Sequence, residues 1–352
     1  MPHLVGDARC ERLATCHLSF GQAPLPFPAD PSTRSTTDRD VSGSLRASSH
    51  PSHRAGRLPR GRSYDADGDR WRYVAARSYL FVPGDRSDML AKAVGKGPDA
   101  VIADLEDAVH PRGKEAARHV TADWLAGESP VERWVRVNSG DTMRADVAMI
   151  APALPDGILL PKVRTATDID VLAVALDEAG ATILPVVPLI ETALALFHLL
   201  EIASADGVAR LMLGEIDLAA DLGLDESSAS TWLPIRLDVV AASGAAGIDA
   251  PIAPVSPAFD EPDRFLAETR ELLALGFGSR AAIHPRQIEP IHAALTPDTA
   301  KVVAARNIIA VAQEAAEHGR GVVRGPDGDM IDEAVVRRAR RIMDAARRAG
   351  IA

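Results

Sequence analysis

Short apolar runs alternate with amphipathic stretches from residue 77 to the end of the chain. Each run has the length of one strand, and the stretches between them carry apolar residues at helical spacing, as in 114–125, 166–178 and 262–275. Prolines interrupt the run at 252–255, which makes it the least regular of the set. We expect strands at 78–82, 100–105, 134–137, 157–160, 183–189, 209–213, 252–255 and 281–283.

This alternation predicts a parallel α/β fold. Eight strands separated by helices favour a (β/α)8 TIM barrel over an open sheet, and we place the barrel at 77–295. Residues 298–317 and 331–348 read as two further helices, joined by a glycine-rich link at 319–329. Because this part is too short for a domain of its own, we expect 296–352 to form a C-terminal helical segment. It should pack on its own barrel or on a neighbouring subunit.

The N-terminal part of the chain has a different composition. From about residue 21 to 72 it is rich in Ser, Pro, Arg, Asp and Gly and has few periodic apolar positions. Such a segment buries too little apolar surface to offset the entropy of ordering, so we expect 1–76 to be a disordered extension. Its Arg and Ser content resembles a transit peptide, although scattered Asp residues argue against one.

Composition and charge exclude several classes of function. The chain is 47% hydrophobic and 25% charged, with a net charge of -10 and no basic patch interleaved with aromatic residues, which argues against nucleic-acid binding. No apolar run approaches the length of a membrane span, and the signal-peptide pattern is missing, so we expect a cytoplasmic protein without membrane contact. The two cysteines, Cys10 and Cys16, lie outside the predicted barrel, which excludes a thiol nucleophile there.

Polar residues follow the predicted strands at their carboxyl ends, where barrels of this kind place functional groups. Crowded carboxylates repel one another unless a cation lies nearby, and an all-oxygen set without a His/Cys cluster suits Mg²⁺. Arg136 and Lys162 add positive charge for an anionic substrate. The residues at this end are Arg86, Asp104, Glu106, Arg136, Asn138, Lys162, Glu191, Asp217 and His284.

Structural roles compete with catalytic ones at three positions. We expect Asp107 to pair with Arg112 or Lys114, and His284 to cap a strand end by hydrogen bonding. For Lys162, pairing with carboxylates is favoured over a Schiff-base role, because no apolar pocket is evident around it.

Several segments resemble one known family, the HpcH/HpaI aldolase and citrate lyase β-subunit group. The likeness is to its stand-alone CitE-like and malyl-CoA lyase-like acyl-CoA lyases, and the matching segments occur in the family's order from residue 77 onward. They are RSYLFVPGDR (77–86), DLEDAV (104–109), RVN (136–138), LPK (160–162), PLIETA (188–193), GEIDLAADLG (214–223), IHPRQI (283–288) and GDMID (328–332).

The resemblance implies a Mg²⁺-dependent TIM barrel, commonly a homotrimer, that cleaves or forms a carbon–carbon bond beside a thioester. It implies that Glu191 and Asp217 bind the metal directly. Asp104 and Glu106 would then lie beside the metal and hold its waters.

The resemblance also assigns substrate contacts. Arg136 corresponds to the catalytic residue that binds the reacting carbonyl, and Asp332 to an acid/base delivered by the lid of a neighbouring subunit. Phe81, Arg86 and Lys92 match positions that hold coenzyme A.

Two positions depart from the family pattern. Ser279-Arg280 stands where Gly-Lys is common, which puts a coenzyme A or loop contact in doubt. Glu333 replaces a proline after the MID segment, which affects the geometry of the lid.

The expected reaction is reversible cleavage of a 3-hydroxyacyl-CoA of the malyl-CoA or citramalyl-CoA type into acetyl-CoA and a 2-keto acid. Alternatives are a malate-synthase-like or thioesterase-like condensation and hydrolysis, and a citrate lyase β-type subunit that depends on an acyl carrier. An aldolase for free pyruvate substrates is disfavoured by Arg86 and Lys92.

Overall fold

A computed structural model describes residues 62–64, 71–73, 76–181, 184–225, 229–325 and 328–352. The predicted extension 1–76 lies almost wholly outside these residues and stays a prediction. Within it, β1 (Arg62–Tyr64) pairs antiparallel with β2 (Trp71–Tyr73).

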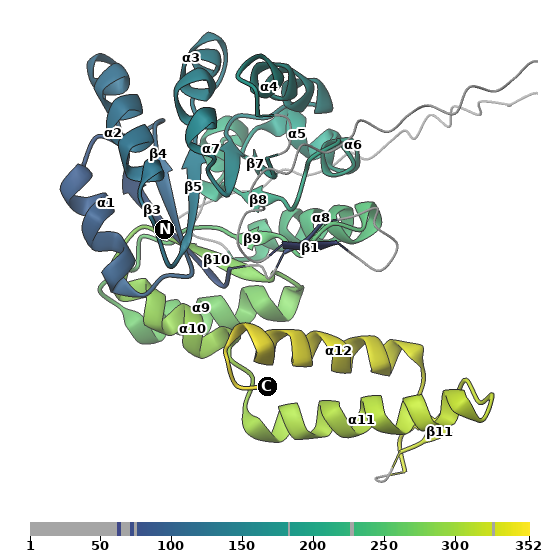
Figure 1. Cartoon of the computed structure of the whole chain (residues 1–352). Helices are drawn as coiled ribbons and strands as arrows, with labels where there is room; N and C mark the ends of the chain where they lie inside the picture. The colour runs from purple at the N-terminus through teal and green to yellow at the C-terminus, as the bar shows by residue number, and fades with distance from the viewer. Residues whose placement is uncertain (1–61, 65–70, 74–75, 182–183, 226–228, 326–327) are drawn as a thin grey trace, which may run out of the picture. The chain divides into compact units, whose positions relative to one another are not determined.

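Eight parallel strands close into a barrel in the order β10-β3-β4-β5-β6-β7-β8-β9, which confirms the predicted TIM-barrel fold (Figure 1). β9 spans two residues because Pro251 and Pro254 flank it and have no N–H to give to a ladder. The strands are β3 (Ser78–Pro83), β4 (Ala100–Asp104), β5 (Glu132–Arg136), β6 (Gly157–Leu160), β7 (Val186–Ile190), β8 (Met212–Leu213), β9 (Ile252–Ala253) and β10 (Ser279–Ala282).

Successive side chains of each strand point to opposite faces and build two separate cores. One set fills the barrel interior, including Tyr79, Ile102, Trp134 and Leu159, and the alternate set packs against the surrounding helices. Gly157 makes room for the Trp134 ring, since a Cβ at Gly157 would lie 2.1 Å from a ring carbon.

Ten helices of the described residues accompany the barrel strands, and those predicted at 114–125, 166–178 and 262–275 are confirmed to within one residue. α9 begins with a proline in its first turn and is capped at its C-terminus by Gly276, whose φ of 114° an L-residue rarely adopts. The helices are α1 (Ser87–Ala93), α2 (Lys114–Ala126), α3 (Asp141–Ile150), α4 (Ala166–Glu178), α5 (Ala193–Phe197), α6 (Leu199–Ala203), α7 (Glu215–Leu222), α8 (Ala229–Ala246), α9 (Pro262–Leu275) and α10 (Ile288–Leu295).

Beyond the barrel, α11 (Thr299–Glu317) and α12 (Glu333–Arg348) pack against each other (Figure 1). A hairpin of β11 (Val323–Arg324) and β12 (Met330–Ile331) lies in the link between them. Both helices were predicted, and each begins one residue after a capping aspartate. In the part of the chain that the structure describes, no helix is long and apolar enough to cross a bilayer.

Candidate active site

Asp104 and Arg136 stand opposite each other at the carboxyl ends of β4 and β5. Arg136 donates from Nε to Asp104 Oδ1 at 2.8 Å and from Nη2 to Oδ2 at 2.6 Å. The same carboxylate accepts from the backbone N–H of Glu106 at 2.9 Å and of Ala108 at 3.2 Å. Asp104 is buried, so this set of donors fixes it in one orientation.

Glu106 lies beside Asp104 and Arg136, and its carboxylate oxygens can still accept hydrogen bonds. Its Oε2 is 3.0 Å from Arg136 Nη1 and its Oε1 is 3.2 Å from Lys162 Nζ. These are ion-pair distances, but the angles are not those of hydrogen bonds, so both buried oxygens lack a hydrogen-bond donor. Burial raises the pKa of Glu106, although the charges of Arg136 and Lys162 oppose the shift.

Arg136 faces an aromatic ring as well as two carboxylates. Its guanidinium lies 5.1 Å from the centre of the Phe81 ring, a cation–π distance. Burial disfavours the charged guanidinium, yet the hydrogen bonds and charges of Asp104 and Glu106 outweigh it and raise the pKa of Arg136. The side chain is therefore a permanent, oriented cation beside Phe81.

Glu191 directly follows β7 and is held by the main chain of the neighbouring strand end. The backbone N–H of Lys162 donates to Glu191 Oε1 at 2.7 Å, and Lys162 adopts a left-handed φ of 54° to do so. A Cβ at Gly214 would lie 2.8 Å from Glu191 Oε2, so only glycine permits this close approach. Burial raises the pKa of Glu191 to about 7, against the hydrogen bond from Lys162.

Asp217 lies in the first turn of α7 and is half-buried. Its charge raises the pKa of both Glu191 and Lys162, so Asp217 lies close enough for its charge to act on the other predicted metal ligand. The other acid of that turn, Glu215, is engaged elsewhere, accepting from Arg236 Nε at 2.7 Å and from Nη2 at 3.0 Å. Asp217 is thus the acid of this turn that remains near Glu191.

The donor set fits Mg²⁺. Among the described residues no three His, Cys, Asp or Glu side chains are arranged as a ready-made metal cluster. Magnesium does not require one, because it binds one or two carboxylates and completes its shell with water and substrate oxygens. Glu106 contributes two buried oxygens without a hydrogen-bond donor, and the glycine at 214 lets the Glu191 carboxylate pack close to the main chain after β8.

The residues matched to coenzyme A binding divide between two places. Phe81 lies next to Arg136, as described above, whereas Arg86 and Lys92 are exposed on or before α1. Both cations approach Asp88, with Arg86 Nε at 2.9 Å and Lys92 Nζ at 3.8 Å. Their charges face solvent, as a contact to phosphate groups would require.

Asp332 caps α12, where its Oδ1 accepts from the N–H of Val335 at 2.9 Å. Within the residues that the structure describes, no hydrogen bond or ion pair joins Asp332 to the carboxylates around Glu191. Its assignment as an acid/base delivered between subunits stays a prediction.

Neighbouring polar residues have structural roles. Lys114 Nζ donates to the carbonyl oxygens of Leu105 at 2.6 Å and of Glu106 at 2.5 Å, while Asp107 lies 3.9 Å from Lys162 Nζ. The expected pairing of Asp107 with Arg112 or Lys114 is therefore wrong, because Lys114 is used to hold the backbone after β4. The expected pairing of Lys162 with a carboxylate is confirmed by Glu106.

Asn138 helps to hold the backbone around the site in place. Its side chain donates to Leu105 O at 2.9 Å and to Asp146 Oδ2 at 2.7 Å, and Arg118 Nε donates to the same aspartate. His284 Nδ1 accepts from the N–H of Arg286 at 3.2 Å, so His284 does cap by hydrogen bonding, but it caps the short 3-10 turn Pro285–Gln287 and not the strand end.

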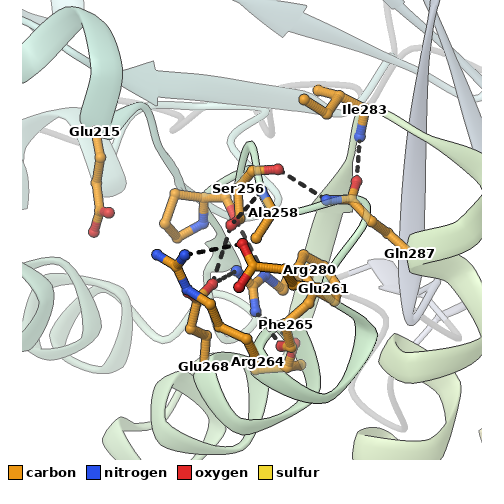
Figure 2. Close-up of polar contacts among 12 residues, drawn as sticks. Glu215, Ser256, Ala258, Glu261, Arg264, Phe265, Glu268, Arg280, Ile283 and Gln287 are labelled. Atoms are coloured by element: carbon orange, nitrogen blue, oxygen red, sulfur yellow. Dashed lines mark hydrogen bonds and ion pairs between the residues drawn. The ribbon is translucent and has the colours of Figure 1, made fainter.

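Arg280, one of the two departures from the family pattern, is a buried structural residue (Figure 2). It donates to Thr269 Oγ1 at 2.5 Å and to Phe265 O at 3.1 Å, and it lies 3.3 Å from Glu268. Its guanidinium also stacks 3.9 Å from the centre of the Phe265 ring. Burial lowers the pKa of Arg280 to about 10. Arg280 therefore ties α9 to β10 and offers no charge to a ligand, a role that the sequence did not reveal.

An eight-stranded barrel with oxygen donors and a partly buried arginine at the carboxyl ends of its strands has the arrangement of a TIM-barrel enzyme. The family model described as HpcH/HpaI aldolase/citrate lyase matches residues 77–285, and the chain belongs to this family.

Three relatives describe its place in the family. The (3S)-malyl-CoA thioesterase of Cereibacter sphaeroides is 33% identical over 278 residues, covering 77% of this chain and 94% of the relative. The citrate lyase subunit beta-like protein of Deinococcus radiodurans is 32% identical over 276 residues, covering 76% and 96%. The crystal structure of CitE from Mycobacterium tuberculosis, in complex with magnesium, acetoacetate and coenzyme A, has a TM-score of 0.64 and 30% identity, covering 79% of this chain and 99% of CitE.

Proposed function

We propose that this protein is a Mg²⁺-dependent carbon–carbon lyase. Its substrate would be a 3-hydroxyacyl-CoA of the malyl-CoA or citramalyl-CoA type, and its products acetyl-CoA and a 2-keto acid. The observation that carries the proposal is the position of Arg136. This partly buried cation is held by Asp104 and Glu106 at the same barrel end as Glu191 and Asp217.

Glu191 and Asp217 would hold the metal, with Asp104 and Glu106 orienting its waters. When bound, Mg²⁺ would supply Lewis-acid polarisation of the hydroxyl and keto oxygens of the substrate. The magnesium in the CitE structure supports this part of the proposal.

Arg136 would stabilise the thioester oxygen. Cleavage of the carbon–carbon bond turns the hydroxyl into the keto group, its proton leaving to water, and places the electron pair of the bond on the acetyl-CoA fragment as an enolate. The oxygen of this enolate is negative only once the bond has begun to break. A fixed guanidinium therefore interacts more strongly with the transition state than with the substrate. The bidentate contact with Asp104 holds Arg136 in place before the reaction begins.

Asp332 would return a proton to the methylene carbon of the enolate, or abstract it in the direction of synthesis. Because its described contacts lie within its own segment, the reaction would use Asp332 from a neighbouring subunit of a homotrimer. Phe81, Arg86 and Lys92 would contact coenzyme A, with the two exposed cations facing its phosphates.

A second candidate is hydrolysis of the same thioester, favoured by the name of the Cereibacter sphaeroides relative, (3S)-malyl-CoA thioesterase. Incubation of the purified protein with Mg²⁺ and either malyl-CoA or citramalyl-CoA separates the two. A lyase releases acetyl-CoA and a 2-keto acid, which phenylhydrazine traps. A thioesterase releases free coenzyme A and the hydroxy acid. Cleavage of neither substrate would reject both.

A further inference from the structure

Lys162 has a larger part in this site than pairing with one carboxylate. Its ammonium lies 3.2 Å from Glu106 Oε1 and 3.9 Å from Asp107 Oδ2. The charges of Glu191 and Asp217 also act on it. We call these four residues, Glu106, Asp107, Glu191 and Asp217, the acidic set.

The cations near this set are not equivalent. Arg136 donates from Nε and Nη2 to Asp104, and its side chain is only 13% exposed, so it is held in place. The side chain of Lys162 is 40% exposed, and its ammonium is held to Glu106 by a single contact at 3.2 Å and not by a bidentate pair. An ammonium on four flexible carbons is therefore free to leave the carboxylates when another cation enters.

The backbone conformation of Lys162 holds its ammonium beside the acidic set. A left-handed φ of 54° is unfavourable for a lysine, and glycine would adopt it at lower cost. The N–H of Lys162 needs that conformation to reach Glu191, but glycine would supply the same N–H. A lysine therefore stands at a position where the main chain favours glycine, and glycine would not supply its ammonium group.

We infer that the Lys162 ammonium is an internal counter-ion of the acidic set that competes with Mg²⁺. In the metal-free protein it offsets repulsion among the four carboxylates. When the metal binds, the ammonium moves away, so part of the binding free energy is used to displace it. This inference rests on the proposed metal site and adds a residue that sets its affinity.

Titration of Mg²⁺ into the metal-free protein by calorimetry tests the inference, because it measures binding without turnover. Lys162→Met should lower the Kd for Mg²⁺ by about three- to tenfold, since removing a positive charge nearby strengthens attraction for a cation. High KCl should shrink the difference through screening. Lys162→Arg should bind Mg²⁺ as wild type does, and Lys96→Met, which removes an exposed charge from the segment after α1, should do the same.

Thermal unfolding supplies the second measurement. Lys162→Met should melt below wild type without metal and gain more from saturating Mg²⁺. Lys162→Gly keeps the backbone N–H that donates to Glu191 and removes the strain of a left-handed lysine. It should lower the Kd for Mg²⁺ in the same way, and it replaces the methionine variant if that variant does not fold.

An unchanged or higher Kd in Lys162→Met or Lys162→Gly would overturn the inference and make Lys162 a residue that positions Glu106. If wild type binds Mg²⁺ and the variants bind it more tightly while no acyl-CoA is cleaved, the proposed reaction fails and this inference stands. If wild type binds no Mg²⁺, both fail.

Discussion

Asp104 receives two parallel hydrogen bonds from Arg136, at 2.8 and 2.6 Å, across the ends of adjacent barrel strands. The strand register aligns these two residues directly. The buried carboxylate and the partly buried guanidinium each lose hydration, and each compensates the other. This pair orients the arginine proposed to stabilise the enolate.

Asp104→Ala removes one partner of this buried pair. We expect the free energy of unfolding to fall by about 3 kcal/mol or more, because Arg136 would keep only its contact with Glu106. Urea unfolding measures the loss. Asp88→Ala, which removes an exposed carboxylate, is the control and should leave stability close to wild type. Equal stability of both variants would contradict the structural role of the pair.

Gly214→Ala places a methyl group 2.8 Å from Glu191 Oε2. Because the side chain of Glu191 must move, the Kd for Mg²⁺ should rise by at least about tenfold while the fold is kept. Gly244→Ala is the matched control, since its new Cβ would meet no atom within 4 Å. Calorimetry with Mg²⁺ gives the comparison, and unchanged binding in Gly214→Ala would argue against Glu191 as a ligand.

The ionisation of Glu132, which lies away from the proposed metal site, should make the stability of the protein depend on pH. Burial raises the pKa of Glu132 to about 7, although a hydrogen bond from Trp134 Nε1 at 2.8 Å opposes the shift. The folded state therefore holds this proton more tightly than the unfolded state. The resulting stabilisation is fully present below the ordinary glutamate pKa of about 4.5 and is lost as pH rises through about 7.

Glu132→Gln keeps an acceptor for Trp134 and cannot ionise. The stability of this variant relative to wild type should increase by up to about 3 kcal/mol between about pH 4.5 and about pH 8. Urea unfolding across this range measures the difference. A constant difference would show that Glu132 has an ordinary pKa in the folded protein.

Asp332→Asn tests the acid/base assignment. Asparagine caps helices as well as aspartate, so α12 and Mg²⁺ binding should be unaffected. The turnover number should fall by about a hundredfold or more, since the amide neither accepts nor returns the proton. Single-turnover assays with the metal-loaded protein measure the rate. Turnover at the wild-type rate would reject the role of Asp332.

The barrel and much of its rim were predictable because apolar runs and strand-end polar residues follow the period of a parallel barrel. Pro251 and Pro254 shortened β9, which the irregular run at 252–255 anticipated. Glu191 was identified by its place after an apolar run, and its environment confirms a buried carboxylate there.

Other features needed the three-dimensional structure. The pairing of Asp104 with Arg136 depends on the register of two strands 32 residues apart, which sequence spacing does not define. The sequence gives no indication of the left-handed backbone at Lys162, because lysine rarely adopts that conformation. Asp107 was assigned the wrong partner because sequence proximity to Lys114 does not show that its ammonium binds backbone carbonyls.

The most direct test of the account is condensation by the purified full chain. The protein is mixed with Mg²⁺, acetyl-CoA and glyoxylate, pyruvate or oxaloacetate, and mass spectrometry follows both the acyl-CoA adduct and free coenzyme A. The account predicts an intact 3-hydroxyacyl-CoA adduct with one of the keto acids, abolished by EDTA. Release of free coenzyme A without an adduct, or no product from a protein that binds Mg²⁺, would contradict a stand-alone acyl-CoA lyase.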